Sequence, residues 1–202
     1  MDTMPDKEHL DELFKRYFGK TPDEHRNRRI HKELTPAILD GIPDADLAQA
    51  IRDFTLEAIG GEWLDQPERI PALGPGFAAA YFTDIAEVEI NNGGFNQLFY
   101  NCGRKSVVLA KAGAELLGLH GFAALLGRAL EIEERERPRL EKIREAGSLE
   151  VFFESYQDDP FRELDDAFSQ LDPKTGVALV RLIRIRPELF CGRVKPGRKP
   201  RR

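Results

Sequence analysis

A group of polar side chains near the middle of the chain could bind a small molecule. A carboxylate and three carboxamides lie close to a tyrosine in the sequence: Glu89, Asn91, Gln97 and Asn101, with Tyr100. Convergent polar groups of this kind orient ligands in pockets, so the cluster could belong to a small-ligand-binding domain or an enzyme. The same side chains could instead satisfy backbone groups at the ends of two helices, as a structural lock. The sequence is compatible with both interpretations.

No other residues form a convincing catalytic or metal-binding pattern. The four histidines lack the spacing of metal ligands relative to acids or cysteines: His9, His25, His31 and His120. No glycine-rich phosphate loop follows a strand, and neither Cys102 nor Cys191 has a histidine nearby in sequence to activate it. Asp84 and Glu87 are more typical of a solvated helix surface than of an acid and base pair. We therefore expect a protein that is not an enzyme, with no catalytic residue, metal or cofactor.

Two helices joined by a sharp corner are expected to position the polar cluster. Apolar residues recur at helical spacing over residues 77–90: Ala78, Tyr81, Phe82, Ile85 and Val88. Asn92, Gly93 and Gly94 then stop this helix, because glycine adopts left-handed dihedrals without steric cost and asparagine tolerates them. A second short helix follows with its own apolar stripe: Phe95, Leu98, Phe99 and Cys102. Gln97 and Asn101 share another face of this second helix.

Glu89 breaks the apolar pattern of the first helix. It projects into the apolar stripe near the helix C-terminus, where the helix dipole disfavours an anion. We expect Glu89 to accept hydrogen bonds from the backbone N–H groups of Gly94 and Phe95, or from the Gln97 carboxamide. The alternative is a side chain that extends from the last turn into solvent.

The run from Glu89 to Asn101 resembles the signature of a bacterial family of DNA-mimic proteins, a helical domain of unknown function with the motif N-G-G-F-x-Q-x-F-Y-N. The residues that carry the resemblance are Glu89, Asn91, Asn92, Gly93, Gly94, Phe95, Gln97, Phe99, Tyr100 and Asn101. The similarity extends over roughly residues 75–190, where amphipathic helices follow the motif. It implies an all-helical fold and a homodimer that binds a transcription factor in place of DNA. The homodimer rests on the resemblance alone.

We expect an all-α protein with a compact multi-helix domain. Residues 1–72 should form an N-terminal helical extension, residues 73–191 the DNA-mimic-like domain that contains the corner, and residues 192–202 a disordered basic tail. The loop at residues 66–76, which is rich in proline and glycine, marks the boundary. Within the extension, four apolar residues predict a helix that ends at Gly60: Leu47, Ile51, Phe54 and Ala58.

Further helices are expected after the corner. Ser106 should cap a helix that Gly118 ends, and another should run from residue 121 to residue 137, with Pro138 starting the next. Asp159 and Pro160 supply an N-cap and a first-turn proline for a helix with four apolar residues: Phe161, Leu164, Phe168 and Leu171. Residues 177–185 suit either a helix or a strand, since they include β-branched side chains.

Composition restricts the class of protein. A chain of 202 residues with 41% apolar content can bury a core. The first six residues lack the basic and apolar regions of a signal peptide, and the longest apolar stretch, residues 116–127, is too short to span a membrane. We expect a cytoplasmic protein without membrane contact, in which both cysteines are free thiols.

Acidic residues are segregated into two blocks, although the net charge is only −5. Residues 40–68 hold eight acids against Arg52 alone, and residues 145–172 hold nine against Arg162 alone, so the blocks carry −7 and −8. By contrast, the run from Glu131 to Arg137 is nearly balanced by its own arginines and those that follow. The acids expected to contact a partner are Asp44, Asp46, Asp53, Glu57, Glu150, Glu154, Asp158, Glu163, Asp165 and Asp166.

The acidic blocks lead to the functional hypothesis. Their carboxylates lack local basic partners, so they must repel one another, face solvent or meet a basic ligand. Carboxylates four residues apart on a helix are separated by about 6 Å, and helices side by side could approximate the phosphate array of DNA. We expect a non-enzymatic acidic module that occupies the DNA-binding surface of a basic partner protein such as a transcription factor. The alternative is that the acids only keep the protein soluble. Nucleic acid would contact only the tail, residues 192–202.

Overall fold

The computed structural model describes residues 11–12, 15–16, 21–60, 67–146, 148, 159–171 and 174–194. The chain divides into two units, Met1–His31 and Lys32–Arg202. In the first unit, α2 (Pro22–Arg26) begins with a capping box. The Thr21 hydroxyl accepts the Glu24 N–H at 3.3 Å, and the Glu24 carboxylate accepts the Thr21 N–H at 2.7 Å. These two bonds satisfy backbone donors that a helix start leaves without partners.

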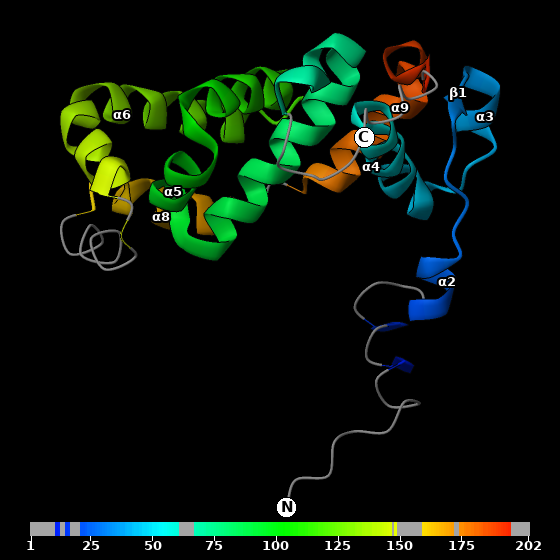
Figure 1. The fold of residues 1–202 in the computed structure, drawn as a ribbon, viewed down its shortest axis with the longest axis horizontal. Helices are drawn as coiled ribbons and strands as arrows, with labels where there is room; N and C mark the ends of the chain where they lie inside the picture. The colour runs from blue at the N-terminus through cyan, green and yellow to red at the C-terminus, as the bar shows by residue number, and fades with distance from the viewer. Residues whose placement is uncertain are drawn as a thin grey trace, which may run out of the picture. The chain divides into compact units, whose positions relative to one another are not determined.

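The second unit has the all-α architecture that the sequence predicts, with one pair of two-residue strands. Its elements are β1 (Glu33–Leu34), α3 (Pro36–Asp40), α4 (Asp44–Ile59), η1 (Pro67–Leu73), α5 (Pro75–Leu116), α6 (His120–Ala146), α8 (Arg162–Ser169), α9 (Thr175–Ile185), η3 (Pro187–Phe190) and β2 (Gly192–Arg193). Helix α5 contacts α4, α6, α8 and α9, so it is the element around which the others are arranged (Figure 1). We expected residues 32–72 to belong to an N-terminal extension. They lie in this unit instead, and they supply its helices α3 and α4.

Helix α5 changes direction at two glycine positions, as the turns of its green ribbon show (Figure 1). Gly93 and Gly94 have non-helical dihedrals, with φ of +72° at Gly94, and Gly103 has φ of +70°. These breaks divide α5 into segments of residues 75–92, 95–102 and 104–116. The predicted corner is confirmed at Gly93 and Gly94. The predicted cap at Ser106 is wrong, because the chain breaks at Gly103 and the Ser106 hydroxyl donates to the Cys102 carbonyl at 2.8 Å.

The structure tests two further predictions, the end of α4 and the secondary structure of residues 177–185. Helix α4 ends at Gly60, which has φ of +87°, as expected of a C-terminal glycine. Residues 177–185 lie in α9, where Leu179 and Ile183 are buried at helical spacing. The hydroxyl of Thr175, at the start of α9, donates to the Glu87 carboxylate and ties α9 to α5.

Other boundaries differ from the predictions. The proposed loop at residues 66–76 contains the 3₁₀ helix η1, which buries Ile70. Pro138 lies inside α6 instead of starting a new helix, and the ribbon of α6 changes direction in its C-terminal part (Figure 1). Before α8, the Asp159 carboxylate accepts the Phe161 N–H at 2.9 Å, although the helix itself begins at Arg162. Four further apolar residues, whose spacing also predicts a helix, lie outside the described residues: Leu149, Phe152, Phe153 and Tyr156.

The end of the chain is partly anchored. Strands β1 and β2 pair antiparallel, with Glu33 opposite Arg193 and Leu34 opposite Gly192. Arg193 also forms an ion pair with Glu33 at 2.7 Å. Gly192 and Arg193 therefore do not belong to a disordered tail, because backbone pairing fixes them, whereas residues 195–202 lie outside the described part. Among the described helices, none combines the length and apolar content that a bilayer span requires.

Two hydrophobic clusters form the core of this unit. One joins the middle of α5 with α6 and α8, and its rings of Phe99 and Phe161 stack at 5.3 Å. The other joins α3, α4, the start of α5, α9 and η3, and there Phe54 and Phe77 stack at 5.2 Å. Both predicted thiols are free. The breaks in α5 allow one helix to contribute to both clusters.

The third segment of α5 packs closely on the first at Gly113. A Cβ atom there would lie 2.9 Å from the Ala79 Cα and 3.1 Å from the Thr83 Cγ2. Backbone at this distance cannot move away as a flexible side chain could. The glycine is therefore needed for space, even though its dihedrals are helical.

We expect Gly113→Ala to lower the free energy of unfolding by about 1–3 kcal/mol relative to Gly127→Ala. Gly127 is a matched control, because it also lies in a helix and an added Cβ meets only the end of the Lys111 side chain, at 3.4 Å. Urea denaturation of the two variants measures the difference. Equal stabilities would show that the two segments of α5 do not pack as described.

Candidate functional site

The polar cluster at the corner is centred on Glu89. The Gln97 Nε2 donates to Glu89 Oε2 at 2.8 Å, and the Asn101 Nδ2 donates to the same oxygen at 2.7 Å. The predicted contact with Gln97 is confirmed. The break at Gly93 and Gly94 turns the second segment of α5 so that its amide face meets the end of the first segment. Two neutral donors thus stabilise a carboxylate that the helix dipole disfavours.

The backbone N–H of Phe95 has a different partner from the one predicted. It donates to Asp165 Oδ1, on α8, at 2.9 Å, so the prediction that it would bind Glu89 is wrong. Gly94 makes this contact possible, since a Cβ atom at Gly94 would lie 2.5 Å from Asp165 Oδ2. Gly94 is therefore required both for its left-handed φ and for the space that Asp165 occupies. Asp165 is partly buried and is not part of an open acidic surface.

Burial changes the ionisation of two groups near the corner. Desolvation raises the pKa of Asp165 to about 6; the Phe95 N–H opposes the shift, and the charges of Asp159 and Asp166 add to it. Desolvation, with the charge of Glu89, raises the pKa of Cys102 to about 11. The Cys102 thiol stays protonated at neutral pH and is unsuited to act as a nucleophile.

The remaining residues of the motif differ in how far they are buried. Phe95 and Phe99 are buried in the core, whereas Asn91 and Asn92 are exposed and Gly93 and Tyr100 are partly buried. Among the carboxamides predicted to cluster, Gln97 and Asn101 meet at Glu89, while Asn91 faces solvent. The donors and the acceptor satisfy one another. This arrangement favours a structural lock, although the lock joins side chains and not the backbone groups that were predicted.

Two acids of the first acidic block form ion pairs with bases of the same chain. Asp44 forms an ion pair with Arg184 at 2.7 Å, and Glu57 pairs with Lys32. Asp53 is 4% exposed and accepts a hydrogen bond from Gln49 at 2.8 Å. Asp46 is partly buried on the same helix. Asp44 and Glu57 lack bases nearby in the sequence, as expected, but they pair with Arg184 and Lys32, which are distant in sequence and close in the fold.

The second acidic block retains an exposed part on α8. Glu163 and Asp166 are exposed and lie three residues apart, whereas Asp165 points to the corner. Glu150, Glu154 and Asp158 lie outside the described residues. Of the predicted acids that the structure describes, Asp44, Glu163 and Asp166 are exposed, and Asp44 is paired with Arg184. Glu163 and Asp166 are therefore the stronger candidates for contact with a partner.

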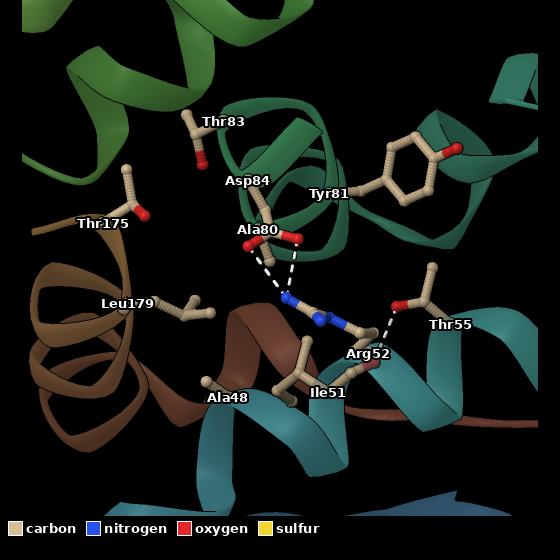
Figure 2. Close-up of a pocket in the computed structure, with 11 residues that line it drawn as sticks. Ala48, Ile51, Arg52, Thr55, Ala80, Tyr81, Thr83, Asp84, Thr175 and Leu179 are labelled. Atoms are coloured by element: carbon tan, nitrogen blue, oxygen red, sulfur yellow. Dashed lines mark hydrogen bonds and ion pairs between the residues drawn. The ribbon is translucent and has the colours of Figure 1, made fainter. Parts of the chain in front are cut away.

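A cavity of about 120 Å³ lies between α4, α5 and α9. Figure 2 shows Arg52 of α4 reaching to the carboxylate of Asp84 on α5, with Leu179 of α9 pointing toward them. Arg52 Nη2 contacts Asp84 Oδ1 at 2.8 Å and Oδ2 at 2.7 Å. Burial raises the pKa of Asp84 above its ordinary value, and Arg52 acts in the opposite direction. The prediction that Asp84 and Glu87 form a solvated pair is wrong, because Glu87 accepts the Thr175 hydroxyl.

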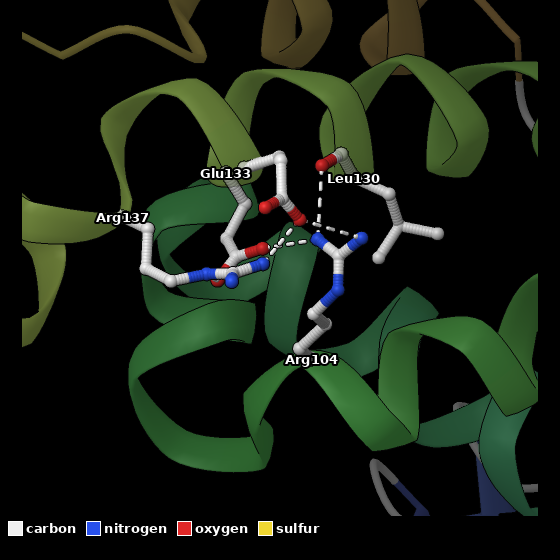
Figure 3. Close-up of polar contacts among 5 residues, drawn as sticks. Arg104, Leu130, Glu133 and Arg137 are labelled. Carbon is white, nitrogen blue, oxygen red and sulfur yellow. Dashed lines mark hydrogen bonds and ion pairs between the residues drawn. The ribbon is translucent and has the colours of Figure 1, made fainter.

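A second polar cluster that the sequence did not reveal joins α5 to α6 (Figure 3). Arg104 donates to the Leu130 carbonyl at 3.1 Å and pairs with both Glu133 and Glu134, the latter at 3.1 Å. Glu133 also contacts Arg137 at 3.7 Å, as its spacing predicts. Only the pairing within α6 could be predicted from the sequence, because no sequence pattern connects Arg104 to α6. The cluster fixes the third segment of α5, directly after the break at Gly103.

We expect Glu89→Gln to destabilise the fold by about 1 kcal/mol, because two charge-assisted hydrogen bonds become neutral ones. For a chain of this length the midpoint of thermal unfolding should fall by about 2–4 °C. Glu131→Gln on the exposed face of α6 is the matched control and should leave the midpoint unchanged. Differential scanning calorimetry measures both. An unchanged midpoint for Glu89→Gln would contradict the lock.

Asp165 should make stability depend on pH. Its folded pKa of about 6 lies above the ordinary 3.8, so the folded state holds the proton more tightly than the unfolded state does. The resulting stabilisation is present below pH 3.8 and is lost as the pH rises to about 6. Urea titrations of the wild type and Asp165→Asn should therefore show the wild type losing stability relative to the variant over this range. Parallel curves would place Asp165 in solvent.

The corner and its neighbouring contacts lie within a region that matches a known protein family. Residues 71–185 match the model of a family described as DMP19-like protein. The match contains the corner, the Asp165 contact and the Arg104 cluster, and it leaves α3 and α4 outside. No curated protein and no solved structure matches the chain. Because the matched residues make up more than half of its length, the chain belongs to the DMP19-like protein family.

Proposed function

We propose that this protein is a non-enzymatic binding module that presents carboxylates to a basic, DNA-binding partner protein. Membership of the DMP19-like family is the observation that carries the proposal. The family is one of DNA mimics, and this chain concentrates acids in the second block, within the matched residues. A protein that binds DNA displays a cationic surface, which an array of carboxylates can occupy in place of phosphates.

Helix α8 is the part of the described structure best suited to this role. Its exposed acids, Glu163 and Asp166, are separated by about 4.5 Å along the helix. Both are held on a rigid element, since Phe161 and Leu164 are fully buried and Asp165 is bonded to the corner. The corner thus supports the proposed binding face and need not contact the partner itself.

The first acidic block has a smaller part in this proposal. Asp44 and Glu57 already have cationic partners in the chain, and a basic protein would have to displace Arg184 or Lys32 to reach them. A homodimer, which the family resemblance implies, would double the number of carboxylates presented on α8. The alternative role of the corner as a ligand pocket is disfavoured by the hydrogen bonds that Glu89 makes with Gln97 and Asn101.

We expect reversal of the two α8 charges, Glu163→Lys with Asp166→Lys, to reduce partner binding by about tenfold or more. The matched control is Asp40→Lys with Glu68→Lys, which changes the net charge equally at two exposed acids of the first block. Each protein is immobilised and used to capture proteins from a native lysate at low and high salt. Proteins retained by the wild type and the control, but not by the α8 variant, should elute as salt rises and be displaced by duplex DNA.

Two results would contradict the proposal. Capture that does not depend on salt or on DNA would exclude mimicry. Equal losses in the α8 variant and in the control would show that net charge, and not a surface on α8, determines binding.

A further inference from the structure

The cavity between α4, α5 and α9 has an apolar interior. Ala48 and Ile51 of α4, Ala80 of α5 and Leu179 of α9 line it, and its volume is about 120 Å³. An apolar cavity of about 150 Å³ can hold benzene. This cavity is therefore large enough for the aliphatic part of a small molecule. Such a molecule would leave its polar end at the opening.

The opening carries one cation and one anion. Arg52 is 43% and Asp84 29% exposed at the side chain, and a single nitrogen of Arg52 makes both contacts to the carboxylate. Strong arginine–carboxylate pairs use two nitrogens in a fork. A pair that is partly exposed and joined end-on adds little stability. Replacing the contact between Arg52 and Asp84 by contacts with a ligand therefore costs little free energy, provided that both side chains gain a new partner.

We propose that this cavity binds a small zwitterion, an α-amino acid with a short aliphatic side chain. The ligand carboxylate contacts Arg52, the ligand ammonium contacts Asp84, and the aliphatic side chain enters the apolar interior. A zwitterion carries the same two charges as the ion pair at the opening, so both protein charges keep an opposite partner. A ligand with one charge would replace the contact of only one member of this ion pair, and the other member would lose it.

The hydroxyl hydrogens of Thr55 and Thr83 are not available to a ligand carboxylate, which leaves Arg52 as its partner. Thr55 donates its hydroxyl hydrogen to the Ile51 carbonyl at 2.8 Å, and Thr83 donates to the Ala79 carbonyl at 2.6 Å. Their oxygens can then only accept further hydrogen bonds. The cavity is distinct from the acidic face of α8, and its floor includes α4, which lies outside the family match. Ligand binding there is independent of the proposed partner.

Isothermal titration calorimetry of the full chain with L-valine tests the proposal. Its analogues separate the charges: 3-methylbutanoate lacks the ammonium, isobutylamine lacks the carboxylate, and isobutanol lacks both. We expect L-valine to bind in the millimolar range and each analogue to bind about tenfold or more weakly. Binding of isobutanol as tight as that of L-valine would reduce the site to an apolar void and overturn the proposal.

Two variants test the location of binding. Gly176 lines the cavity, and a Cβ atom added there meets no heavy atom within 4 Å, so the side chain of Gly176→Leu has room to extend across the cavity. Arg52→Gln removes the cation at the opening, and Arg181→Gln, on the exposed face of α9, is its matched control. L-Valine binding should be lost in the first, weakened about tenfold in the second, and unchanged in the control. Circular dichroism verifies that each variant is folded. Absence of L-valine binding to the wild type, or binding unaffected by Gly176→Leu, would refute the assignment.

Discussion

The hydrogen bond between the Phe95 N–H and Asp165 links the local backbone to the tertiary structure. A break at Gly94 exposes backbone donors at the start of a new helical segment, and a buried donor without a partner is costly. Asp165 meets this need from a helix seventy residues later in the sequence. Phe161, directly before this helix, lies against Phe99, and Phe168 of the helix lies against Phe95. The position of α8, and with it the orientation of Glu163 and Asp166, thus follows from the corner. The raised pKa of Asp165 is the electrostatic consequence of placing a carboxylate there.

Local patterns in the sequence were sufficient for much of the fold. The corner, the glycine end of α4 and the apolar faces of α4 and α8 follow from residue types and spacing within a few turns. Partners distant in sequence could not be predicted in the same way. Spacing along the sequence cannot show that Arg184 lies opposite Asp44, or that Glu133 lies opposite Arg104. Gly103 was missed because it lies in a run of otherwise helix-compatible residues, and Pro138 was misplaced because a proline can also lie within a helix.

The two acidic blocks show that acids concentrated in the sequence need not form an acidic surface in the fold. Both blocks carry a similar excess of acids. In α4, Asp44 and Glu57 are paired with Arg184 and Lys32, and Arg52 of the same helix pairs with Asp84, so ion pairs connect this helix to the rest of the unit. Helix α8 instead turns one carboxylate inward and leaves its neighbours exposed. Sequence therefore identified where acids are concentrated, whereas the identity of the exposed ones depended on the fold.

The antiparallel pairing of β1 and β2 brings the two ends of the helical unit together. The Val194 N–H donates to the Lys32 carbonyl at 2.9 Å, and the neighbouring residues form the strand pair. Chains whose ends lie close together can be rejoined and reopened elsewhere without loss of the core. A circular permutant that links residue 194 to residue 32 can therefore retain this architecture. The order in which the helices follow one another along the chain is thus separable from the way in which they pack.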